Sequence, residues 1–299
     1  MKKISTYIPS VIISVLMIFC FLGGAAALIA DININPDKTV KFAEEEKIDD
    51  KVMASIDKYY REKANSTGIP ATVFTDSISR EYVREQIRIY IDSTYDVLED
   101  GGKFSAEPSK NEELEAAIDK FFNDYADDTN YEKDAEFEKK LENTKKNAYK
   151  TIGGYCDIFK VSSMESHGLL KKLSKLYSRR YPLTIALSAF GTALIVLLFI
   201  IHRRNRKEIL YWCGISAVIA GIMGAFPCLY LISTKYYDSF SIKQPQVFAA
   251  YTKSLYALTE AYTAACIAIA VIGICMIVIY GVLSGKKQKA SEVLPITKE

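Results

Sequence analysis

Four long apolar stretches constrain what this chain can fold into. They cover residues 8–30, 183–201, 210–232 and 257–283. Each stretch holds roughly the 20 residues that an α-helix needs to cross the hydrocarbon core of a bilayer. The two middle stretches contain no charged residue. The sequence therefore predicts an all-α integral membrane protein with four transmembrane helices.

The longest segment between the stretches, residues 31–181, is highly charged. Residues 31–170 carry 20 Lys and Arg against 31 Asp and Glu, a net charge of −11. Such an acidic surface repels nucleic acids, so we expect no nucleic-acid partner. The stem that follows, residues 171–180, has basic residues and no acidic one. Two interpretations of the stem stay open: an ordinary membrane-flanking segment, or a contact with anionic lipid headgroups.

Positive charge marks the cytoplasmic side of the predicted helices. The basic residues of the short segments are Lys2, Lys3, Arg203, Arg204, Arg206, Lys207, Lys286, Lys287 and Lys289. Because short cytoplasmic loops are enriched in Lys and Arg, these segments are predicted to lie inside the cell. The predicted order is a cytoplasmic N-terminus (1–7), transmembrane helix 1 (8–30), an extracytoplasmic helical domain (31–181) inserted between the first and second spans, transmembrane helix 2 (183–201), a cytoplasmic turn (202–207), transmembrane helix 3 (210–232), an extracytoplasmic loop (233–256), transmembrane helix 4 (257–283) and a cytoplasmic tail (284–299).

The N-terminal stretch fits two interpretations. Lys2 and Lys3, the apolar run and Ala25–Ala27 are typical of a secretory signal peptide with its cleavage site. The apolar run is long for such a peptide, which favours a retained membrane anchor. Either interpretation leaves the 31–181 domain outside. The Lys-rich composition and the Met-Lys-Lys start favour a bacterial plasma membrane.

The spacing of apolar residues in the 31–181 domain is helical. Four stripes repeat every three or four residues: Ile48, Val52, Ile56 and Tyr59; Val83, Ile87, Ile91, Tyr95 and Leu98; Leu114, Ile118, Phe121 and Tyr125; Phe137, Leu141, Ala148 and Ile152. Ser109 with Glu112, and Thr129 with Glu132, match the capping-box pattern of helix starts. Leucines of a last segment, 164–181, pack either on this domain or against a partner. We expect a core of about four amphipathic helices.

No residue pattern predicts an enzyme. His167 and His202 have no companions at the spacing of metal ligands. The paired carboxylates at 49–50 and 127–128 lie in heavily charged segments, and we expect them to be exposed. Cys156, the one cysteine of the 31–181 domain, is expected to be a small buried residue. We therefore expect no catalytic residue, no cofactor and no metal.

Small residues in the third stretch predict a helix-packing surface. Ala217, Gly221 and Ala225 recur every four residues, a spacing that lets helices approach closely in lipid. Two partners remain open for this surface: the fourth stretch of the same chain, or another subunit. The expected partners are thus the lipid bilayer and either a membrane protein or a second copy of the chain.

Two functional hypotheses follow. The first is a non-enzymatic multi-pass membrane protein whose outer helical domain binds or senses an extracellular or envelope partner. The second rests on topology: one span, a large outer domain and three further spans resemble the permeases of ABC systems that act on lipoproteins or cell-wall enzymes. This resemblance implies a permease-type subunit of an export or cell-envelope machine.

Overall fold

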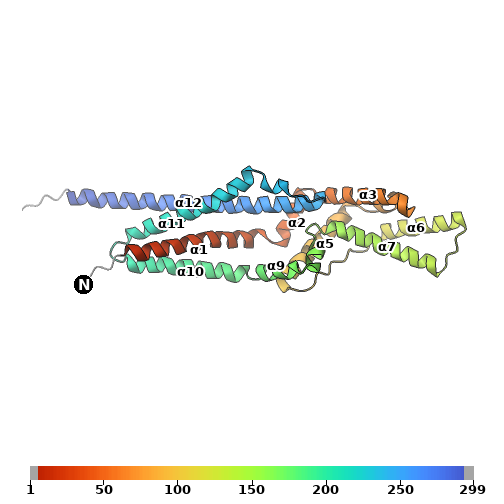
Figure 1. Ribbon diagram of the computed structural model, residues 1–299, viewed down its shortest axis with the longest axis horizontal. Coiled ribbons are helices and arrows are strands. Elements are labelled where there is room, and N and C mark those ends of the chain that lie inside the picture. Colours follow the sequence, from red (N-terminus) through yellow and green to blue (C-terminus); the bar gives the residue numbers. More distant parts are fainter. Residues whose placement is uncertain (1–5, 293–299) are drawn as a thin grey trace, which may run out of the picture. The chain divides into compact units, whose positions relative to one another are not determined.

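The computed structural model describes residues 6–292, with side chains through residue 285, and these residues form helices and no strand (Figure 1). The helices are α1 (Tyr7–Asn33), α2 (Pro36–Glu45), α3 (Ile48–Thr67), α4 (Thr72–Thr75), α5 (Arg80–Asp100), α6 (Glu112–Thr129), α7 (Ala135–Cys156), α8 (Val161–Ser166), α9 (Leu169–Tyr177), α10 (Arg180–Ile201), α11 (Lys207–Ser233), the 3-10 helix η1 (Tyr236–Ser239) and α12 (Pro245–Glu292). The all-α prediction is confirmed.

The chain divides into two compact units. The first, which we call the membrane unit, contains α1, α10, α11, η1 and α12 from Leu255 onward. The second, which we call the helical domain, contains Ile34–Ser178 and Phe240–Ser254.

The membrane unit is built from apolar helices. Within the described part of the chain, four helical segments are long and apolar enough to cross a membrane: Tyr7–Asn33, Leu169–Ile201, Lys207–Ser233 and Pro245–Gly285. This agrees with the four predicted stretches. Within the unit, α1 packs against both α10 and α11, and Figure 1 shows α1 and α10 side by side.

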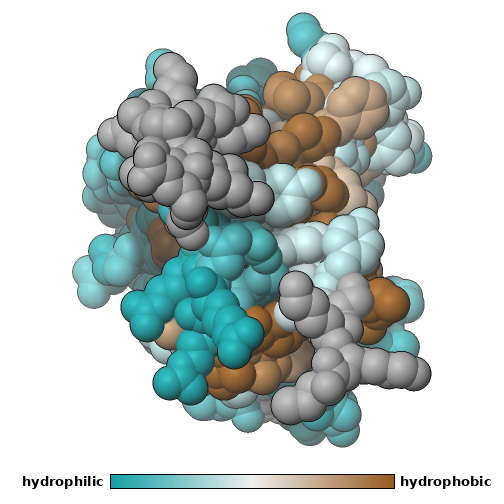
Figure 2. Space-filling model, turned by 90° about the vertical axis from the view of Figure 1, so that its left-hand side faces the viewer, coloured by the Kyte–Doolittle hydropathy of each residue, from teal (hydrophilic) through white to brown (hydrophobic). Residues whose placement is uncertain are grey.

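The outer surface of the membrane unit is also apolar. Its interior includes Met17 and Leu198, which are almost completely buried, whereas Phe19, Ile185 and Phe226 are 64%, 65% and 74% exposed. Exposed apolar surface of this extent is costly in water and is suited to lipid. Hydrophilic side chains gather at the end of the unit that Figure 2 faces, where residues 203–206 of the α10–α11 turn are exposed.

The core of the helical domain follows the predicted stripes. Phe137, Leu141, Ala148 and Ile152 of α7 are all buried, as that stripe predicted. α5 is the central helix, because it contacts α2, α3, α7 and α9. The four-stripe helical core is thus present, with shorter helices between its members.

In two stripes the last residue is displaced by one position from the prediction. Tyr60, not Tyr59, completes the buried face of α3. In α6 the buried residue is Ala126, which is 1% exposed, while Tyr125 is 57% exposed. The face of a helix is set by its angular spacing and not by side-chain size, so Ala126 is buried in place of the larger Tyr125, and Tyr60, four residues after Ile56, is buried in place of the equally large Tyr59.

Both predicted capping boxes are wrong. α6 is capped by Asn111, whose side chain accepts a hydrogen bond from the backbone N–H of Leu114 at 2.9 Å. Asp134 caps α7 by accepting from two backbone N–H groups. Ser109 instead bonds the side chain of Gln86, and Thr129 is the last residue of α6. Asn and Asp are at least as good N-caps as Ser and Thr. Each helix therefore starts directly after the Asn or Asp that caps it, and not after the Ser or Thr further upstream.

Asp49 also differs from its prediction, because it is buried and not solvated. Only 4% of the residue is exposed, and its carboxylate accepts a hydrogen bond from Arg84 at 2.8 Å. Arg80, which also pairs with Asp50, lies within 4.0 Å of it. A buried carboxylate needs such partners. The cluster fastens α3 to α5.

The predicted loop 233–256 is largely helical. α12 starts at Pro245, twelve residues before the apolar stretch, and proline is favoured at the first position of a helix. Val247 and Ala250 are buried, and Ala250 lies in the core of the helical domain. Polar residues such as Gln246, Thr252 and Lys253 interrupt the apolar residues of this segment, so hydropathy alone assigns it to a loop.

Candidate functional site

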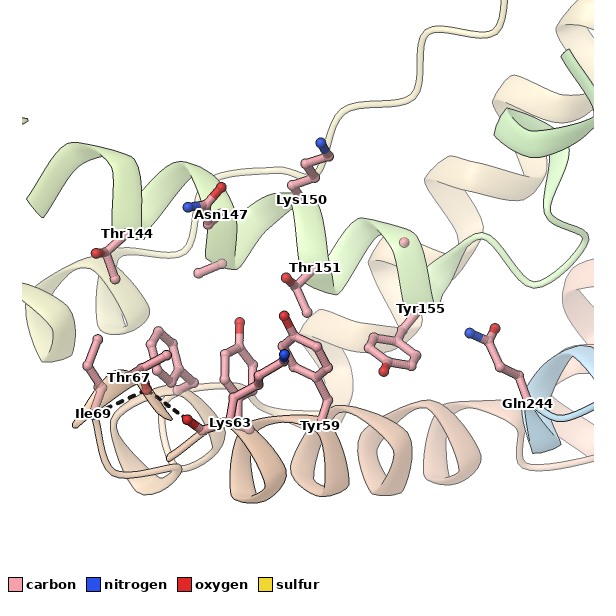
Figure 3. A pocket seen from close by; sticks show the side chains of 14 residues that line it. Tyr59, Lys63, Thr67, Ile69, Thr144, Asn147, Lys150, Thr151, Tyr155 and Gln244 are labelled. Carbon is pink, nitrogen blue, oxygen red and sulfur yellow. Dashed lines mark hydrogen bonds between the residues drawn. The ribbon is translucent and has the colours of Figure 1, made fainter. Parts of the chain in front are cut away.

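A groove between α3 and α7 is the strongest candidate for a binding site in the helical domain. It has a volume of about 610 Å³, within the roughly 300–1,000 Å³ range of small-molecule sites. Figure 3 shows Tyr59 and Lys63 reaching into it from α3, and Thr151 and Tyr155 from α7. Gln244, from the segment before α12, lies at one end.

Aromatic side chains form the floor of the groove. The rings of Tyr60 and Phe74 are stacked, with centroids 4.0 Å apart, and Tyr59 packs edge-on against Tyr60 and Tyr155. The Tyr60 hydroxyl is buried and has no hydrogen-bond partner among the described residues. Burial raises the pKa of Tyr60, and the nearby Thr151 hydroxyl offsets only part of that rise. Tyr60 therefore contributes a neutral, buried hydroxyl, close to that of Thr151, to the wall of the groove.

Gln244 supplies a second polar group without a partner. Its side-chain oxygen is buried and accepts no hydrogen bond from the described residues, while its backbone carbonyl accepts from the N–H of Phe248 at 2.9 Å. Buried polar atoms without partners are uncommon, because each loses the bonds it would make to water. The segment is held in place by a bond from Ser55 to the Gln246 side chain at 2.9 Å and by one from the Tyr251 hydroxyl to the Phe159 carbonyl at 2.6 Å.

The charge of the groove is opposite to that of the domain around it. Its fourteen lining residues include two lysines, Lys63 and Lys150, and no Asp or Glu. A second groove, on another side of α7, has a volume of about 820 Å³ and balances four lysines with four glutamates. Lys150 lines both, and in Figure 3 its ammonium points away from α3, whereas that of Lys63 lies among the tyrosines. The first groove is thus a positive site in a domain of net negative charge.

In the membrane unit the structure brings together three polar residues that are far apart in the sequence. The hydroxyl of Ser10 lies 2.8 Å from Nε2 of His202, and Nδ1 of His202 lies 2.6 Å from a carboxylate oxygen of Glu208. Sequence reasoning missed this cluster because no spacing connects position 10 to position 202. Its one signal was a histidine at the end of an apolar stretch.

The order of these groups is that of an acyl-transfer triad, but the surroundings do not support catalysis. Ser10 is wholly buried, His202 is 4% exposed, and the Ser10 hydroxyl also donates to the Thr6 carbonyl at 2.7 Å. A nucleophile needs room beside it for a substrate and an oxyanion site. The cluster instead fastens α1 to the α10–α11 turn.

The predicted helix-packing residues lie on α11. Gly221 faces α12 so closely that a Cβ placed on it would lie 2.5 Å from the Cys266 carbonyl oxygen. A Cβ on Gly273 of α12 would lie 2.9 Å from that of Ala217. Ala225 is buried within the membrane unit. Gly214 was not predicted, but it also contacts α12. Its carbonyl oxygen would lie 2.7 Å from a Cβ placed on Gly273.

Cys156 is an enclosed residue of the helical domain. It has no exposed surface, and burial raises the pKa of its thiol to about 12. A thiol in that state is a poor nucleophile. Among the described residues, no group of three or more His, Cys, Asp or Glu could hold a metal ion.

Comparison with known proteins adds no relative. No protein-family model, curated protein or solved structure matches the chain.

Proposed function

We propose that this protein is a non-enzymatic multi-pass protein of the plasma membrane whose helical domain lies outside the cell and binds a partner in the α3–α7 groove. One observation carries the proposal: a groove of ligand size whose wall holds Lys63 and the unpartnered side-chain oxygen of Gln244, with no carboxylate among its lining residues. The partner would be an extracellular or envelope molecule.

The charges of the groove indicate the chemistry of that partner. An ammonium at Lys63, three tyrosine rings and an unpaired amide oxygen at Gln244 suit a ligand with an anionic group, an apolar ring and a hydrogen-bond donor. Most of the domain surface repels anions, so the groove would be the preferred place for such a ligand.

The orientation rests on the basic residues of the short segments. Arg203, Arg204 and Arg206 are exposed in the α10–α11 turn, and the positive-inside rule favours a cytoplasmic position for them. One span, α10 or α11, separates this turn from each segment of the helical domain. The domain would then lie on the opposite side of the membrane, outside the cell. The same turn bears on the permease alternative: it holds five residues between α10 and α11, too few for a helix that would contact an ATPase. This favours the first hypothesis.

The orientation can be tested by labelling in intact cells. A cysteine at the exposed position Glu132 should react with a membrane-impermeant maleimide before lysis, and one at Arg204 only after permeabilisation. Cys156 does not interfere, because it is buried. Labelling of Glu132→Cys only after lysis would reverse the topology.

The groove can be tested with a simple anion. The full chain in zwitterionic nanodiscs should bind 4-fluorobenzoate about five- to tenfold more tightly than the neutral 4-fluorobenzamide. A charge-assisted hydrogen bond contributes roughly 1.5–3 kcal/mol, and solvent screening at an exposed lysine reduces that contribution. Fluorine NMR line broadening measures the binding of both probes. Lys63→Gln should remove the preference. Lys150→Gln is the matched control, since its ammonium points away from α3. Equal binding of the two probes, or equal losses in the two variants, would contradict the proposal.

A further inference from the structure

The stem helix α9 (Leu169–Tyr177) has one face packed and one apolar face open. Leu170 and Tyr177 are 3% and 9% exposed, and this face packs on α5, where the Tyr177 ring lies 6.0 Å from that of Tyr95. The Tyr177 hydroxyl also donates to the Ile34 carbonyl at 3.1 Å. The helical domain therefore holds α9 in a fixed rotation about its axis.

The open face carries three leucines. Leu169, Leu173 and Leu176 are 49%, 43% and 70% exposed. Their spacing of four and three residues aligns them in one stripe along the helix. Because the buried face is fixed by α5, this stripe cannot turn inward. A second surface must cover the leucines or leave them in water.

Basic residues border this stripe. Lys171, Lys172 and Lys175 are exposed, as is Arg179 just after the helix. The sequence holds no Asp or Glu from position 166 to position 207. Leucines beside lysines on a short amphipathic helix are typical of helices that lie at a membrane surface, where the lysine stems extend toward the headgroups.

The covalent distance to the membrane limits where α9 can lie. α10 begins at Arg180, three residues after α9 ends, and its apolar run starts at Leu183. Seven residues separate Leu176 from Leu183, which is about 10 Å as helix. The headgroup layer is roughly 5–8 Å thick on each side of the hydrocarbon core. The C-terminal part of α9 is therefore within reach of that layer.

We propose that α9 is an interfacial helix that places Leu173 and Leu176 among the lipids of the outer leaflet and its lysines against anionic headgroups. The partner is a lipid surface that carries negative charge, of the kind that phosphatidylglycerol supplies. In the sequence, α9 is followed directly by α10, whose apolar surface lipid must cover in any case. The inference is independent of the groove, and its assignment to the outer leaflet rests on the proposed orientation.

Spin labelling distinguishes lipid from the other occupants of this face. A nitroxide at Leu176→Cys is measured in the full chain, with the native cysteines replaced, in vesicles that contain phosphatidylglycerol; Lys171→Cys, on the lysine side, is the control. Oxygen concentrates in lipid, and a nickel chelate stays in water. We expect the oxygen-to-nickel accessibility ratio at position 176 to exceed that at position 171 about fivefold or more, as for the apolar face of an interfacial helix.

Each other result overturns the proposal. High nickel accessibility at position 176 would mean that the leucines face water. Low accessibility to both reagents would mean that a second copy of the chain covers them. The charge is tested separately: replacing phosphatidylglycerol by phosphatidylcholine, or changing Lys171, Lys172 and Lys175 to Gln, should lower the ratio at position 176. An unchanged ratio in both experiments would overturn the role of anionic headgroups.

Discussion

At the scale of single residues, the structure places polar groups where hydropathy suggested only lipid or water. His202 stands at the end of an apolar stretch, yet it is buried between Ser10 and Glu208. Asp49 belongs to a charged segment, yet its carboxylate is enclosed beside Arg84. In both cases the partner comes from a distant part of the chain. Local composition cannot supply that information, because it depends on how the helices pack.

His202→Ala should destabilise the membrane unit. Removing the imidazole leaves the Glu208 carboxylate without its 2.6 Å partner and opens a gap beside Ser10, so we expect a loss of about 2–3 kcal/mol. Buried Cys20 and Cys213 lie in the same apolar cluster as Leu198. Their reaction with a thiol-reactive dye during heating therefore reports the unfolding. Arg203→Ala, at the adjacent exposed position, should leave the midpoint unchanged; equal shifts in both variants would contradict the role of His202.

At the scale of helices, the sequence predicted the elements well and their details less well. The apolar stretches and the α7 stripe were correct because periodicity reflects which face is buried. The errors occurred where two residues compete for one role. Tyr59 and Tyr60 are both large and apolar enough for the α3 core, and Ser109 and Asn111 both suit an N-cap. The α3–α7 groove was not predictable, since it depends on the separation of two helices that the sequence does not encode locally.

Gly221→Leu should disrupt the contact between α11 and α12. The new side chain would meet the Cys266 carbonyl and Ala270, of which the first is backbone and cannot move aside. Overpacking of this kind typically costs about 1–3 kcal/mol and more where backbone is involved. Gly281→Leu is the matched control, because a Cβ there meets nothing within 4 Å. We expect lower thermal stability in detergent for the first variant alone. If the two variants melt at the same temperature, this face does not hold the helices together.

At the scale of the whole chain, the two units are each assembled from separated segments. The helical domain takes its main part from Ile34–Ser178 and a second part from Phe240–Ser254, although an apolar stretch lies on either side of each. α12 contributes residues to both units. A ligand that contacts Gln244 would thus bind to the segment that leads directly into a membrane-spanning helix. Under the proposed function, this connection would couple ligand binding in the groove to α12.

The second segment should be needed for the full stability of the helical domain. Val247 and Ala250 are buried, Gln246 accepts a bond from Ser55, and Tyr251 bonds Phe159. Burial of these groups with two hydrogen bonds contributes about 3–5 kcal/mol, a large part of the roughly 5–15 kcal/mol that stabilises a domain. Fragment 34–178 should therefore be helical by circular dichroism but unfold at a lower urea concentration than the same fragment joined through a Gly-Ser linker to residues 240–254.

A single substitution separates a specific contact from a general effect of the added segment. Ala250 has no exposed surface, so Ala250→Asp in the joined fragment places a carboxylate in the core. The free-energy cost of burying that charge exceeds the stability that the segment adds. The urea midpoint should return to that of 34–178 alone, because the segment then detaches while the rest stays folded. Lys253→Asp, at a position that is half exposed and whose ion pair with Glu46 spans 3.5 Å, should keep most of the gain. If all three joined fragments unfold at the midpoint of 34–178, residues 240–254 are not part of this domain, and the route from Gln244 into α12 would have no fixed contact with the groove.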